Sequence, residues 1–205
     1  MTLGFQHIYL ASGSPRRREL LKQIGVAFEP LLLRTQPPRT DVEELPHPEE
    51  SPEDYVVRVA RAKAEAGWLR LYDRKLPKSP VLAADTAIFL DGEIIGKPGG
   101  RERAEATLRR LSGRRHQVLT GVALAYEDRI GTGLSVTAVD FGEVSEAEIR
   151  RYAAGGEPWD KAGAYAIQGR AGAFVARIEG SYSGVMGLPL YETAQLLRQF
   201  DVSPL

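Results

Sequence analysis

The chain has 205 residues, of which 43% are hydrophobic and 26% charged, proportions that are ordinary for a globular protein. We expect a single domain over residues 1–205, because this length can bury a sizeable core. The 27 basic side chains balance the 27 acidic ones, which disfavours a nucleic-acid-binding function, and the lack of cysteine excludes disulfides, thiolate metal sites and cysteine nucleophiles.

The first elements predict a strand, a helix and a second strand. The N-terminus lacks the basic start and long apolar core of a signal peptide, and no apolar run approaches the ~20 residues of a membrane helix, so we expect a cytoplasmic protein with no membrane partner. Residues 8–11 indicate a short buried strand. Ser14 and Pro15 are typical of a helix start, Gly25 of its end, and residues 26–33 predict the second strand.

The middle of the chain begins with a polar segment that is rich in proline. Residues 34–50 predict a long mobile loop, and such loops are often functional lids. Residues 51–72 carry apolar side chains at helical spacing. Residues 81–90 form an apolar strand run, and the Asp-Gly pair at 91–92 predicts a hairpin that returns through residues 93–95.

The second half predicts a helix, two long strands, a helix with a capping box, a strand and a last helix. These elements are expected at residues 101–111, 118–126, 134–141, 145–154, 173–178 and 188–200. Strands and helices alternate at first and strands then pair locally, which predicts an α/β fold with a mixed sheet.

Arg16, Arg17 and Arg18 occupy the first turn of the first predicted helix. Cations are unfavourable there, because the helix N-terminus already carries partial positive charge. A bound anion would reverse this preference, since free backbone N–H groups and arginine side chains together bind phosphate. The alternative is that the three arginines extend into solvent.

Asp85 interrupts the apolar strand run of residues 81–90. An unpaired carboxylate on a buried strand is costly, on the order of several kcal/mol. In open α/β sheets ligands bind near the carboxyl ends of strands, so Asp85 is a candidate functional acid. The alternative is an acid on an exposed turn or bulge.

Two further segments are candidates for ligand contacts. Gly96-Lys97-Pro98 lacks the spacing and the hydroxyl residue of a P-loop, so Lys97 is either a phosphate contact or a surface lysine. In residues 160–169, Lys161 and Gln168 are the long polar side chains among small and apolar ones. Gln168 could read the edge of a base, or it could be a hydrogen-bonded core amide. The histidines show no metal-ligand spacing.

Taken together, short segments along nearly the whole chain resemble the Maf family of nucleoside triphosphate pyrophosphatases, in family order. The matching segments are residues 10–17, 62–64, 84–86, 96–98, 111–113, 120–122, 160–169 and 187–190. The resemblance implies a twisted mixed sheet flanked by helices, in the Maf/Ham1 (ITPase-like) α/β architecture. It also implies a nucleoside triphosphate substrate, a divalent cation (Mg²⁺, with Mn²⁺ as the alternative) and the homodimers that family members often form.

The resemblance also assigns roles to individual residues. It makes Asp85 the general base, with Lys63 and Lys97 beside it in the catalytic set. Residues at the family's positions for substrate selection and phosphate binding are Ser12, Arg16, Arg17, Lys63, Thr86, Lys97, Lys161 and Gln168. Glu43 and Glu44 align with an Asp-Glu pair of the family, after an apparent insertion, and are the expected metal ligands.

Two segments indicate the branch of the family. Asp85-Thr86 and the stretch from Lys161 to Gln168 resemble the branch that acts on dTTP and UTP. The expected reaction is attack of a water on the α-phosphorus, which releases a monophosphate and pyrophosphate. The alternatives are a pyrophosphatase of the 7-methyl-GTP type, or a nucleotide-binding regulator of cell division without turnover.

Overall fold

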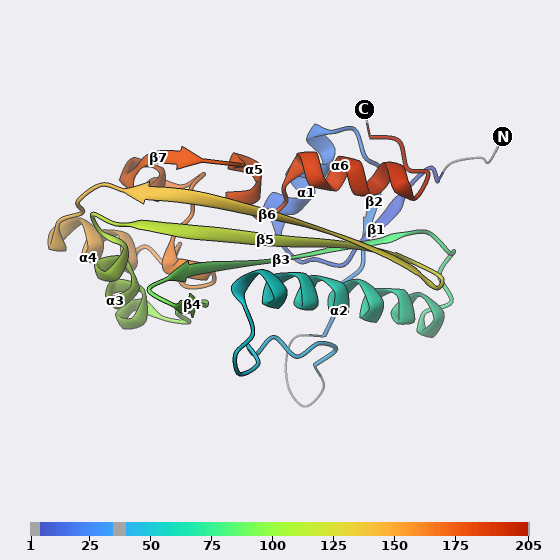
Figure 1. The fold of residues 1–205 in the computed structure, drawn as a ribbon, viewed down its shortest axis with the longest axis horizontal. Helices are drawn as coiled ribbons and strands as arrows, with labels where there is room; N and C mark the ends of the chain where they lie inside the picture. The colour runs from blue at the N-terminus through green and yellow to red at the C-terminus, as the bar shows by residue number, and fades with distance from the viewer. Residues whose placement is uncertain (1–4, 35–39, 205) are drawn as a thin grey trace. The chain divides into compact units, whose positions relative to one another are not determined.

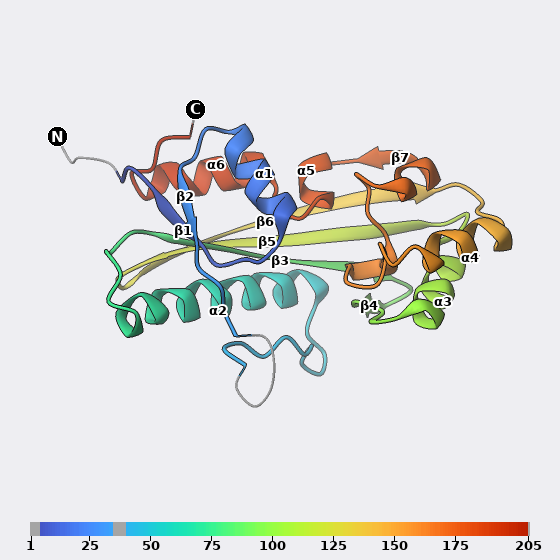
Figure 2. The same cartoon turned by 180° about the vertical axis from the view of Figure 1, so that it is seen from behind.

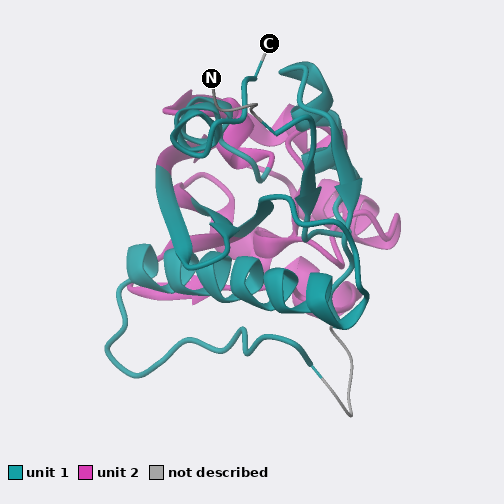
Figure 3. Ribbon diagram, turned by 90° about the vertical axis from the view of Figure 1, so that its right-hand side faces the viewer, with its two compact units in different colours: residues 1–85, 120–135, 187–205 teal, residues 86–119, 136–186 magenta. Residues whose placement is uncertain are grey.

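A computed structural model describes residues 5–34 and 40–204, and the chain divides into two compact units (Figure 3). Among the described residues, unit 1 contains those up to Asp85 together with residues 120–135 and 187–204, and unit 2 contains residues 86–119 and 136–186. The single-domain expectation stays a prediction. Within these described ranges no helix is both long enough and apolar enough to cross a membrane.

Helices and strands alternate in the first part of the chain, as expected. Unit 1 holds β1 (Ile8–Leu10), α1 (Pro15–Gln23), β2 (Phe28–Pro30), α2 (Pro52–Asp73) and α6 (Leu190–Gln199). Unit 2 holds β4 (Glu93–Ile95), α3 (Arg101–Leu111), α4 (Glu146–Ala154), η1 (Ala162–Ala164), η2 (Arg170–Phe174), β7 (Val175–Glu179) and α5 (Tyr182–Val185). Three strands belong partly to each unit, namely β3 (Val81–Leu90), β5 (Arg115–Tyr126) and β6 (Arg129–Phe141).

The strands form one seven-stranded mixed sheet in the order β2-β1-β3-β5-β6-β7, with β4 paired to β3. The first three strands of this order are parallel, because helical segments connect them in sequence; Tyr9 pairs with Val81, for example. The later pairs β3–β4 and β6–β7 are antiparallel. The prediction of an α/β fold with a mixed sheet and flanking helices is confirmed.

Helix α2 covers one side of the unit 1 strands, whereas α1 and α6 lie on the opposite side (Figures 1 and 2). The helix begins as its sequence predicts, because the Ser51 hydroxyl accepts a hydrogen bond from the backbone N–H of Asp54 at 3.1 Å. Its buried face includes Ala60, Ala64 and Trp68, which join the apolar residues of β1, β3 and β5 in one core cluster.

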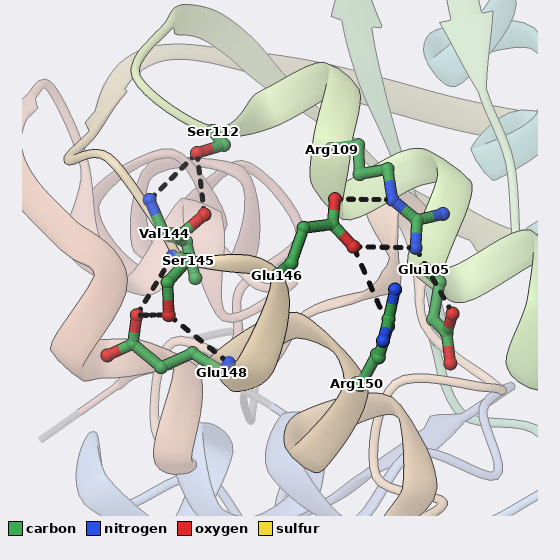
Figure 4. Close-up of polar contacts among 8 residues, drawn as sticks. All are labelled: Glu105, Arg109, Ser112, Val144, Ser145, Glu146, Glu148 and Arg150. Atoms are coloured by element: carbon green, nitrogen blue, oxygen red, sulfur yellow. Dashed lines mark hydrogen bonds and ion pairs between the residues drawn. The ribbon is translucent and has the colours of Figure 1, made fainter.

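In unit 2, helices α3 and α4 lie side by side and are joined by polar contacts (Figure 4). Arg109 of α3 forms a two-pronged ion pair with Glu146 of α4, at 2.7 and 2.9 Å. The predicted capping box at the start of α4 is present, with Ser145 and Glu148 each bonding the other's backbone N–H. The prediction of the capping box is confirmed, whereas the contact between Arg109 and Glu146 was not predicted.

Some element bounds differ from the sequence prediction. Strand β2 is shorter than the expected 26–33, whereas β5 and β6 extend to a two-residue turn in which Glu127 has a positive φ of 55°. Strand β5 begins at Arg115 instead of residue 118. Strand β6 begins at Arg129 instead of residue 134, because the hairpin continues the ladder up to its turn. The short helices η1, η2 and α5 were not predicted.

The fold predicts that Gly121→Ala destabilises the protein. A Cβ at this position of β5 would collide with the backbone carbonyl of Val56 in α2. Backbone atoms of a helix cannot move away by a change of rotamer as a side chain can. We expect the free energy of unfolding to fall by about 1–3 kcal/mol, the usual cost of overpacking. Urea unfolding measures it, with Gly96→Ala as control because an added Cβ there meets nothing within 4 Å. Equal stability of the two variants would contradict this packing.

Candidate functional site

The side chains of Lys63, Asp85 and Glu44 meet in unit 1. The Lys63 ammonium donates to Asp85 Oδ1 at 2.7 Å and lies 2.8 Å from Glu44 Oε1. Lys63 extends from α2, Asp85 from β3 and Glu44 from the segment that precedes α2. Two carboxylates from distant parts of the sequence thus share one cation.

Asp85 is 8% exposed and lies within β3, so the alternative of an exposed turn or bulge is wrong. The sequence alone shows no partner for its carboxylate, but in the structure Lys63 pairs with it at 2.7 Å, which explains why the strand tolerates an acid. A buried carboxylate with an ammonium partner avoids most of the desolvation cost of a lone ion.

The start of α1 brings Ser12 and Arg17 together. The Arg17 guanidinium donates from Nε to the carbonyl of Gly187 at 2.7 Å and from Nη1 to the Ser12 hydroxyl at 3.3 Å. Burial lowers the pKa of Arg17, while the charges of Asp85 and Glu44 act in the opposite direction. Arg17 is therefore within electrostatic reach of the carboxylate pair.

The alternative that the three arginines extend into solvent is wrong, because Arg16, Arg17 and Arg18 are all half-buried. Ser14 occupies the N-cap position as predicted, but its side chain does not cap the helix. Instead the Ser12 hydroxyl accepts a hydrogen bond from the backbone N–H of Ser14 at 3.1 Å. The arginines therefore lie at a helix start that the Ser14 side chain does not cap.

The expected metal ligands Glu43 and Glu44 lie on the described part of the 34–50 segment, and both side chains are exposed. Of the two, Glu44 joins Asp85 at Lys63. Nowhere in residues 5–34 and 40–204 do three or more His, Cys, Asp or Glu side chains form a metal-binding group. Two carboxylates nevertheless suit Mg²⁺, which commonly takes one or two protein carboxylates along with substrate phosphates and water.

In unit 2 the loop that carries Lys97 is fastened to the segment that carries Lys161. The backbone N–H of Gly163 donates to the carbonyl of Gly96 at 3.2 Å, and that of Gly99 donates to Trp159 at 2.9 Å. Lys97 is exposed, whereas the Lys161 ammonium donates to the Glu157 carbonyl at 2.8 Å and to the Asp160 carboxylate at 2.6 Å. The two segments singled out from sequence are thus neighbours.

Gln168 is exposed, so its interpretation as a core amide is wrong. It follows a buried stretch, residues 163–167, whose Tyr165 hydroxyl and His116 Nε2 share a hydrogen bond of 2.9 Å. Thr86, the first residue of unit 2, is half-buried on β3. The exposed amide of Gln168 is free of the core packing that holds its neighbours.

Sequence analysis missed the anchoring role of His116. Residues 115–118 alternate between exposed and buried along β5, and His116 falls on the buried phase. In the sequence, the corresponding signal is the alternation of Arg115 and Gln117 with His116 and Val118. It identifies a buried residue but not its partner, because Tyr165 lies 49 residues further along the chain.

The chain is similar to known proteins over nearly its whole length. Residues 7–200 match the family described as Maf-like protein. The chain is 57% identical over 197 residues to a dTTP/UTP pyrophosphatase of Nitrosomonas europaea, with 96% of this chain and 95% of that protein covered. It is 53% identical over 199 residues to a dTTP/UTP pyrophosphatase of Dechloromonas aromatica (97% and 99% covered) and 50% identical over 200 residues to one of Chromobacterium violaceum (98% and 98%).

The His116–Tyr165 contact predicts that the protein is less stable in mild acid. Burial lowers the pKa of His116 from 6.5 to about 4, so the unfolded chain binds a proton more readily than the folded one. Stability is therefore fully present above about pH 6.5 and is lost as the pH falls towards 4. Urea unfolding at several pH values measures the slope. His116→Gln, which cannot titrate, should flatten it; an unchanged slope would assign the effect to other groups.

Proposed function

The chain belongs to the Maf family, and on that premise we propose that it hydrolyses dTTP and UTP to the monophosphate and pyrophosphate. The close relatives that carry this activity in their names cover nearly the full chain. The observation that carries the proposal is the convergence of Asp85 and Glu44 on the Lys63 ammonium. It places two carboxylates beside a cation, a combination that suits electrostatic catalysis on an anionic substrate.

In the proposed reaction Asp85 accepts a proton from the attacking water. The water oxygen forms a bond to the α-phosphorus while the bond from that phosphorus to the bridging oxygen breaks, and pyrophosphate leaves with the electron pair. Lys63 lies 2.7 Å from Asp85 and would fix the orientation of the carboxylate. Positioning and electrostatic stabilisation account for most catalysis of this kind.

A divalent cation, Mg²⁺ or Mn²⁺, fits the donor set of Asp85 and Glu44, with Glu43 as the further expected ligand. When bound, such an ion neutralises charge on the phosphates and on the leaving pyrophosphate. The Lys63 ammonium contacts Asp85 Oδ1 and Glu44 Oε1 and so already places positive charge beside both carboxylates.

The remaining predicted residues divide between two tasks. We assign phosphate binding to Ser12, Arg16, Arg17, Lys97 and Lys161, and substrate selection to Arg16, Thr86 and Gln168. The support is the half-buried arginine cluster at the start of α1, the exposure of Lys97 and the exposed amide of Gln168. We further propose a cytoplasmic enzyme that binds no nucleic acid and forms a homodimer.

Asp85→Asn should abolish most turnover and leave triphosphate binding largely intact. The amide cannot accept the proton from water, and the loss of a general base typically costs about 10²–10⁴-fold in rate. Pyrophosphate release measures kcat, and Asp91→Asn is the matched control because Asp91 lies in the exposed hairpin turn. Near-normal kcat in folded Asp85→Asn would exclude Asp85 as the base.

dTTP and UTP should be hydrolysed better than CTP, GTP or 7-methyl-GTP. The edge of uracil or thymine presents carbonyls beside an N–H, and the Gln168 amide offers both a donor and an acceptor to that edge. A site built for one edge rejects bases that leave its polar groups unpaired, often by orders of magnitude. Competitive assays of kcat/KM measure the preference.

Gln168→Ala should reduce the discrimination between UTP and CTP, and Gln117→Ala serves as a control at another exposed glutamine. Equal rates for UTP and CTP in the wild type would rule out edge reading by Gln168. A preference for 7-methyl-GTP would instead assign the chain to the other branch of its family.

A further inference from the structure

Residues 40–50, here called the strap, run alongside α2 and contain no helix or strand (Figures 1 and 3). One end is held by Asp41, whose carboxylate lies 3.1 Å from Arg70 Nε and also accepts the backbone N–H of Arg34 at 2.7 Å. The other end is held by Glu50, which pairs with Arg58. Because the strap lacks a strand ladder, side chains of α2 determine where its residues lie.

Arg58 contacts the strap at two points. Its guanidinium binds both carboxylate oxygens of Glu50, at 2.5 and 2.8 Å, and its Nη2 also donates to the carbonyl of Leu45 at 2.9 Å. The pair is largely shielded from water, with 28% of the Arg58 side chain and 9% of the Glu50 side chain exposed. The hydrogen bonds from Arg58 lower the pKa of Glu50 to about 2. Arg58 therefore fixes the strap on both sides of residues 46–49.

Tyr55, one turn earlier on α2, holds the residue next to Leu45. Its hydroxyl donates to the carbonyl of Glu44 at 2.9 Å, and its ring is buried. The Arg58 guanidinium lies over this ring, 5.6 Å from its centroid. Two consecutive carbonyls of the strap, those of Glu44 and Leu45, are thus bound by α2 where the Glu44 side chain turns towards Lys63.

We propose that Tyr55 and Arg58 are positioning residues that hold the Glu44 carboxylate beside Lys63 and Asp85 for the reaction. This inference rests on the proposed function. Within the described part of the chain, neither side chain forms a hydrogen bond or ion pair with Lys63 or Asp85, so we assign both a role through Glu44. Lys63 alone holds Glu44 weakly, because its ammonium is a flexible point charge that also pairs with Asp85. The two-pronged contact of Arg58 with Glu50 fixes both the direction and the distance of the neighbouring strap backbone.

Arg58→Gln should lower kcat about 10–100-fold and raise the Mg²⁺ concentration for half-maximal activity, the usual range when a residue that orients a metal-binding carboxylate is lost. KM for dTTP should change little, because the phosphate-binding residues are untouched. Arg58→Lys should have a kcat between those of the wild type and Arg58→Gln, since lysine retains the positive charge but lacks the two-pronged guanidinium. The matched control is Arg61→Gln, whose partner Glu65 is exposed on the same helix.

Tyr55→Phe removes one hydroxyl, keeps the ring in the core, and should reproduce the direction of the effect if Arg58→Gln proves unstable. A double-mutant cycle then tests whether Arg58 acts on kcat through Glu44. In a Glu44→Gln background, Arg58→Gln should have almost no further effect on kcat. Effects that multiply in the double variant, or wild-type kcat and Mg²⁺ dependence in both single variants, would overturn the proposal.

Hydrogen exchange of the whole chain tests whether Arg58 holds the strap on α2, and it needs no measurement of enzyme activity. Backbone amides of residues 44–50 should exchange faster in Arg58→Gln than in Arg61→Gln, at equal global stability. Equal exchange in the two variants would overturn the proposal even if both were less active. A wild type that releases no pyrophosphate from any nucleotide would refute the proposed function, and with it the catalytic role of the strap, while exchange would still decide whether Arg58 fastens it.

Discussion

The shared ammonium of Lys63 is the interaction on which the candidate site depends. Two carboxylates close to the same point repel each other, and burial of Asp85 would add a desolvation cost. Lys63 offsets both effects through contacts of 2.7 and 2.8 Å. In the proposed reaction, this cluster would keep two acids in place beside one positive charge.

Helix α2 connects this electrostatic balance to the fold. One part of its surface packs on the apolar core of unit 1, closely enough that Gly121 cannot carry a side chain without meeting the helix backbone. Another part carries Tyr55, Arg58, Lys63 and Arg70, which bind the strap or the acids. Because a helix is stiff, the core that fixes α2 also fixes the spacing of these side chains.

In unit 2, different contacts hold the segment that carries Lys161 and Gln168. The segment around Lys161 and Gln168 is irregular, and it is held by the buried His116–Tyr165 hydrogen bond and by a Gly163 whose φ of 67° and close contact with Ile88 admit no side chain. These contacts restrict the backbone of the segment while Gln168 stays exposed.

The sequence by itself determined the elements with strong local signals: the cap at Ser51, the capping box at Ser145, the Asp-Gly hairpin and the apolar run that contains Asp85. It also marked Asp85 and the arginines of α1 as exceptions to local preference. Only the tertiary structure decided that Asp85 pairs with Lys63, 22 residues away, and that Glu44 rather than Glu43 joins them. The reason is physical. Caps and turns form within a few residues, whereas these partners meet only when α2 packs on the sheet and the strap is fastened to α2.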